Sequence, residues 1–132
     1  MTDNVFRTEV CAFLAEALTP EIKRAGELMT SVFADFDATM DWHKTLYAKG
    51  WVAPDWPKEY GGGGRHRAFQ DAATRIMAQQ RTPIMLNAIG LNWTGPLLID
   101  RGSEEEKQKY IRGILSAETI WCQGFSEPEN GS

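Results

Sequence analysis

Cysteine and histidine are scarce in this sequence. The two cysteines among 132 residues, Cys11 and Cys122, lie near opposite ends of the chain and cannot form a disulfide framework, which predicts reduced thiols and a cytoplasmic protein. The two histidines, His43 and His66, have no partner at metal-ligand spacing. We therefore expect neither a metal site nor a Cys–His nucleophile, and interpret the cysteines as buried and the histidines as surface residues.

The chain also lacks an excess of positive charge and an unbroken apolar run. Fourteen basic residues against 18 acidic ones give a net charge of −4, which argues against a nucleic-acid partner. The first four residues lack the basic and apolar regions of a signal peptide. Residues 82–99 carry no charge, but prolines, glycines and asparagines interrupt them, so we expect a buried helix opened by Pro83 and closed by Gly102 and no membrane span.

What the sequence does contain is typical of one helical domain. Its length suits a single core, and 42% hydrophobic with 24% charged residues predicts a folded chain. Apolar residues at three- and four-residue spacing predict helices over residues 4–18, 37–49 and 67–80, with a further start at Thr19-Pro20. Ser103 and Glu106 form a capping box, in which residues 104–106 supply the acidic first turn of a last helix.

Residues 50–64 form an aromatic loop. Two prolines and four consecutive glycines exclude regular structure there, whereas Trp51, Trp56 and Tyr60 require burial, so we expect the loop to pack against the helices. The glycine run, residues 61–64, lacks the Lys-Ser or Lys-Thr of a phosphate-binding loop and is interpreted as a flexible connector.

The pattern changes after Glu118. Residues 119–125 predict a β-strand, and a polar turn follows to Ser132. The expected fold is therefore all-α, a bundle of about five or six helices ending in one strand, and a lone strand needs a partner from elsewhere. From its composition alone, the final turn is either an ordinary polar turn or an anchor for an anionic or carbonyl-rich ligand.

Four segments together resemble the acyl-CoA dehydrogenase family in content and order. They are the G-W…W-P-K-E-Y-G-G stretch of residues 50–62, G-P-L-L…G-S-E-E-E-K at 95–107, I-L-S-A-E at 114–118, and the strand with S-E-P-E-N-G-S at 121–132. The resemblance implies an N-terminal helical domain over residues 1–118. Residues 119–132 would then be the first strand and flavin-contacting turn of a middle β-domain.

The resemblance also implies an FAD-dependent reaction. Family members remove a proton from the α-carbon of an acyl-CoA with a glutamate and transfer a hydride from the β-carbon to N5 of FAD. No residue of this chain matches that glutamate, so the resemblance implies no catalytic residue here and a chain that is inactive alone. The implied partners are acyl-CoA and the remaining dehydrogenase domains or a second subunit, in a homo- or hetero-oligomer.

Individual cofactor contacts follow from the same resemblance. Phe125 and Ser126 fall where amides and a hydroxyl meet the pyrimidine edge of the flavin, and Gln123 falls beside it. Gly131 and Ser132 match the pair that lies near the FAD pyrophosphate. Ser132 also matches a position that lies near the incoming CoA thioester. Helix residues 91–98 would line one wall of the acyl pocket.

Two functions remain open at this point. The chain is either the N-terminal portion of a flavin-dependent acyl-CoA dehydrogenase or a non-catalytic helical interaction subunit that pairs with a fuller dehydrogenase chain.

Overall fold

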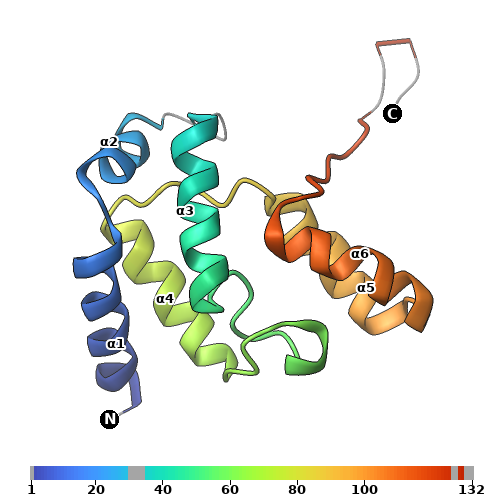
Figure 1. Ribbon diagram of the computed structural model, residues 1–132, viewed down its shortest axis with the longest axis horizontal. Coiled ribbons are helices and arrows are strands. Elements are labelled where there is room, and N and C mark those ends of the chain that lie inside the picture. The colour runs from blue at the N-terminus through green and yellow to red at the C-terminus, as the bar shows by residue number, and fades with distance from the viewer. Residues whose placement is uncertain (1, 30–34, 126–127, 130–132) are drawn as a thin grey trace.

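The computed structural model describes residues 2–29, 35–125 and 128–129, and every regular element among them is helical. The helices are α1 (Thr2–Ala17), α2 (Pro20–Leu28), α3 (Phe36–Lys49), the 3-10 turn η1 (Lys58–Tyr60), α4 (Arg67–Gln79), the π-helical turn η2 (Gly90–Thr94), α5 (Gly95–Arg101) and α6 (Glu104–Ser116). Helices α1, α3 and α4 form one group, α5 and α6 pair beside it, and the C-terminal segment leads away from the helices (Figure 1). The predicted all-α bundle is confirmed.

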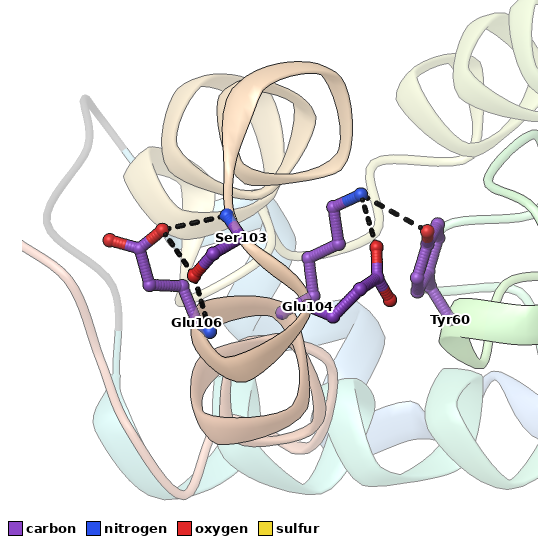
Figure 2. Close-up of polar contacts among 5 residues, drawn as sticks. Tyr60, Ser103, Glu104 and Glu106 are labelled. Atoms are coloured by element: carbon purple, nitrogen blue, oxygen red, sulfur yellow. Dashed lines mark hydrogen bonds and ion pairs between the residues drawn. The ribbon is translucent and has the colours of Figure 1, made fainter.

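Local capping explains where several helices begin and end. The Thr19 hydroxyl accepts a hydrogen bond from the Ile22 amide, with Pro20 at the first helical position. Helix α3 ends at Gly50, whose φ of 74° suits a residue without a side chain. The Ser103 hydroxyl accepts from the Glu106 amide while the Glu106 carboxylate accepts from Ser103, as predicted (Figure 2).

The main core lies where α1 and α4 pack together against the aromatic loop. Val10 and Phe69 are fully buried, and the Trp51 ring lies edge-on to both Phe13 and Phe69, with centroids 4.7 and 5.2 Å apart. Arg65 closes the edge of this core. Its guanidinium donates two hydrogen bonds, 3.0 and 2.7 Å long, to the Glu9 carboxylate. The hydrogen bonds from Arg65 lower the pKa of Glu9.

The aromatic loop is packed as expected, but its glycine run is not a flexible connector. Trp51 and Trp56 are each only 7% exposed. The amides of Gly62, Gly63 and Gly64 donate to the carbonyls of Pro57, Ala53 and Trp56, respectively. A Cβ at Gly62 would overlap the backbone of Trp56. Because glycine has no side chain, the backbone of this run can pack directly against the backbone of the preceding part of the loop. The composition of the run does not predict this contact.

The positions of the histidines and cysteines reverse the sequence-based interpretation in part. His43 is fully buried, because it shares the inner face of α3 with Thr39 and Leu46, and only His66 is exposed. Cys11 and Cys122 are both exposed. Cys11 follows the buried Val10 directly, and successive helical residues face about 100° apart, so adjacency to a core residue does not imply burial.

Two element boundaries also differ from the prediction. The uncharged helix begins at Ala88 rather than at Pro83, because Asn87 lies in a turn and its side chain bonds to the C-terminal segment. Residues 119–125 form no strand, since the described chain places no second strand beside them and a strand is defined by its pairing.

Replacing Gly62 with alanine is expected to destabilise the fold by about 1–3 kcal/mol, because the new Cβ forces Trp56 out of its place. Gly124→Ala is the matched control, since a Cβ at Gly124 meets no atom within 4 Å. Thermal melts of both variants check this. Equal melting temperatures for Gly62→Ala and the unaltered chain would show that the loop is not packed.

The buried His43 ring should make stability depend on pH. Burial lowers the pKa of His43 from 6.5, although the hydrogen bond to Leu115 opposes this shift. A lowered folded pKa means that the stabilisation is present above pH 6.5 and is lost as the pH falls through the folded pKa. The free energy of unfolding should therefore decline from pH 7 towards pH 5, and His43→Gln should reduce that decline. His66→Gln serves as control; an identical decline in both variants would contradict the assignment to His43.

Candidate functional site

The C-terminal end of α6 is closed by contacts from other parts of the chain. A helix leaves its last carbonyl groups without helical partners. Here the Gly113 carbonyl accepts from the Thr119 amide at 3.1 Å, and the Ile114 carbonyl accepts from Asn87 Nδ2 at 2.9 Å. His43 Nε2 lies 2.8 Å from the Leu115 carbonyl. Because a carbonyl only accepts, Nε2 carries the proton.

Asn87 makes three hydrogen bonds although it is fully buried. Besides bonding to Ile114, its Nδ2 donates to the Thr119 carbonyl at 2.9 Å, and its Oδ1 accepts from the Trp121 amide at 2.9 Å. The Trp121 ring packs edge-on against Tyr110, with centroids 5.7 Å apart. The side chain of Asn87 and helix α6 together set where the chain leaves the helices.

The residues expected to contact the flavin lie in the segment beyond Trp121. Gln123 and Phe125 are exposed, Phe125 by 79%, on a stretch that extends from the helices (Figure 1). Among the described residues, the hydrogen bonds of this segment to the helices end at Trp121. Ser126, Gly131 and Ser132 lie outside the described residues, so their roles stay predictions.

A mostly apolar cavity of about 260 Å³ lies between α3, α4 and the uncharged stretch. Its lining is Trp42, Leu46, Trp51, Val52, Gln70, Ala73, Thr74, Met77, Ala78, Thr82, Pro83, Ile84, Met85, Ala88, Leu91 and Asn92. Leu91 and Asn92 belong to the predicted wall over residues 91–98, whereas Trp93 and Leu97 of the same stretch are exposed.

Sequence reasoning missed the part of the wall that precedes Leu91. Ile84, Met85 and Ala88 line the cavity from the turn and the start of the helix. The available signal was the absence of charge from Thr82 onward, which extends over these residues too. None of the residues that line the cavity is ionisable, so the described lining binds an apolar group without supplying an acid or a base.

Charged groups gather instead at the start of α6. Lys107 Nζ donates to Glu104 Oε1 at 2.9 Å and to Tyr60 Oη at 3.2 Å (Figure 2). These hydrogen bonds, that to Glu104 first, raise the pKa of Lys107. Glu106 is engaged in the helix cap, and the acidic run therefore has the structural role predicted for it.

Over residues 2–29, 35–125 and 128–129, no group of three or more His, Cys, Asp or Glu side chains is placed to hold a metal ion. Among the helices described, none is both long and apolar enough to cross a membrane.

Comparison with known proteins identifies relatives over nearly the whole chain. The family described as "Acyl-CoA dehydrogenase, N-terminal domain" matches residues 2–118. Acyl-CoA dehydrogenase IpdE1 of Mycolicibacterium smegmatis is 34% identical over 130 residues, which cover 96% of this chain and 33% of that protein. The mitochondrial short-chain specific acyl-CoA dehydrogenase of Homo sapiens is 33% identical over 91 residues, covering 67% of this chain and 22% of that protein.

Solved structures share the fold. A structure titled "Tcur3481-Tcur3483 steroid ACAD" superposes with a TM-score of 0.77 at 32% identity, covering 98% of this chain and 33% of the other. The ChsE4-ChsE5 complex from Mycobacterium tuberculosis gives a TM-score of 0.74 at 28% identity, with 96% and 31% covered. The chain spans about a third of the length of these relatives. It belongs to the acyl-CoA dehydrogenase family, of which it represents the N-terminal helical domain.

Proposed function

We propose that this chain is the N-terminal portion of an FAD-dependent acyl-CoA dehydrogenase and supplies one wall of its acyl pocket and one edge of its flavin site. The observation that carries this proposal is the apolar cavity, because it is lined by Leu91 and Asn92 of the helix assigned to the acyl pocket. Burial of an apolar acyl chain against such a lining is favourable, by about 25 cal/mol per Å² of apolar surface removed from water.

The C-terminal segment is suited to the flavin. Gln123 and Phe125 are exposed beyond the last hydrogen bond to the helices, so this stretch can turn its backbone towards a bound group. FAD, when bound, accepts the hydride that leaves the β-carbon of the acyl group. The Phe125 amide, with the amide and hydroxyl of Ser126, would stabilise negative charge at the pyrimidine edge, and Gly131 and Ser132 would hold the pyrophosphate.

The remaining parts of the active site would come from outside these 132 residues. The cavity lining supplies no ionisable group, so the base that removes the α-proton belongs to the remaining domains or to a second subunit. Two of the similar structures, Tcur3481-Tcur3483 and ChsE4-ChsE5, are each named for two components, and the first is named a steroid ACAD. We propose acyl-CoA thioesters as the substrate class and further dehydrogenase domains or a companion subunit as partners.

A specific observation also favours the second candidate, a non-catalytic interaction subunit. Trp93 and Leu97, one helical turn apart, are 57% and 63% exposed and suit contact with another polypeptide. The two candidates differ in whether this chain contacts flavin and substrate, which the next two experiments decide.

Flavin binding tests the proposed edge of the site. The chain alone should bind FAD weakly and purify colourless, whereas the complete dehydrogenase that contains it should bind FAD. In that complete enzyme, Ser126→Ala should lower the flavin reduction potential, because a donor to the reduced ring is lost. Potentiometric titration measures this. An unchanged potential would refute the role of Ser126. A yellow preparation of this chain alone, with stoichiometric FAD, would refute the proposal that most of the flavin site lies outside it.

Filling the cavity tests the acyl wall. Ala88→Phe should raise KM for long or bulky acyl-CoA substrates by about 10-fold or more over that for short ones, since it removes space the acyl group needs. Ala15→Phe is the control, because Ala15 is exposed on α1 and does not line the cavity. Equal effects of both variants on all chain lengths would contradict the assignment.

A further inference from the structure

Asn87 connects the two parts of the proposed site. It lies directly before the helix that carries Ala88, Leu91 and Asn92 along the cavity. Its Oδ1 accepts from the Trp121 amide, two residues before Gln123. Asn87 therefore directly precedes the helix that lines the cavity, and its side chain binds the start of the proposed flavin-contacting segment.

The bonding pattern of this amide is specific to asparagine. Nδ2 donates to two carbonyls, those of Ile114 and Thr119, and Oδ1 accepts from one amide. A carboxylate could not donate to those carbonyls, and an apolar side chain would leave one buried and two part-buried backbone groups without this partner. Gly90 completes the fit, since a Cβ there would lie 2.6 Å from Asn87 Oδ1.

We propose that Asn87 is a positioning residue that fixes the distance and direction from the acyl cavity wall to the flavin-contacting segment. This inference rests on the proposed function, because the segment matters to the reaction only if it contacts FAD. Asn87 is not among the residues that line the cavity. It acts through Thr119 and Trp121, which it ties to the end of α6.

Hydrogen exchange in the present chain tests the tether without any flavin. Asn87→Ala should accelerate exchange of the Trp121 amide by about 3- to 10-fold, as expected for one lost hydrogen bond, with little change in α1 and α4. His43→Gln is the matched control, because His43 contacts the same end of α6 at Leu115 but not residues 119–121. An unchanged rate at Trp121 in Asn87→Ala, or equal acceleration in both variants, would overturn the proposal.

Gly90→Ala provides a second variant if Asn87→Ala does not fold. This variant keeps Asn87 but places a methyl group against its side-chain amide. Because alanine is favourable within a helix, the substitution itself should not disrupt the helix. It should accelerate exchange at Trp121 in the same way, and unchanged exchange would count against the tether.

The complete dehydrogenase then tests the consequence for the flavin. Asn87→Ala should shift the visible absorption band of bound FAD and lower the rate of flavin reduction by acyl-CoA about 10-fold, while the KM for acyl-CoA changes less. A changed exchange rate with an unaltered band and rate would overturn the positioning role and leave the proposed function intact. If the unaltered complete protein binds no FAD, the proposed function fails and this inference fails with it.

Discussion

The arrangement of this domain depends on how the last carbonyls of α6 are satisfied. An unpaired buried carbonyl is costly, and the carbonyls of Ile114 and Leu115 accept from the distant side chains of Asn87 and His43, while that of Gly113 accepts from the nearby Thr119 amide. These bonds join α3, the turn before η2 and the C-terminal segment at one point. The hydrogen bonds that satisfy the end of α6 therefore also fix the direction in which the C-terminal segment leaves the helices.

The position at which the C-terminal segment leaves the helices determines what this chain would contribute to the proposed enzyme. Trp121 is held by Asn87 and Tyr110, and the residues beyond it are exposed. Residues on both sides of Asn87 line the cavity, Met85 before it and Ala88 after it. Because the described lining of the cavity has no ionisable group, the function proposed above gives this domain a role in shape and orientation and leaves proton transfer to other parts of the enzyme.

Local signals were sufficient to predict most of the fold. The capping box at Ser103, the Pro20 start and the Gly50 end are each set by neighbouring residues, and the structure agrees with all three. The buried His43, the packed glycine run and the late start at Ala88 depend on partners 5 to 72 positions away, so periodicity and composition could not reveal them. The extended tail shows the same limit, because strand formation depends on a neighbour that local sequence does not supply.

The sequence was enough to identify the family and the segments that would form the candidate site, but not the contacts that position them. Leu91 and Asn92, which the resemblance assigns to the acyl wall, line the cavity, and Ile84 and Met85 line it because the chain turns before Ala88. That an acyl group occupies this cavity stays a prediction. Asn87 carries no signal in the sequence, since its importance lies in three tertiary hydrogen bonds.

The central claim is that one helical domain presents an acyl wall and a flavin edge at a fixed separation. A crystal structure of the complete dehydrogenase with FAD and a non-reactive acyl-CoA analogue tests it most directly. We expect the acyl chain to contact Ala88 and Leu91 and the Phe125 amide to lie about 3 Å from a flavin oxygen or nitrogen. An acyl chain bound away from this cavity, or residues 123–125 turned away from the flavin, would contradict it.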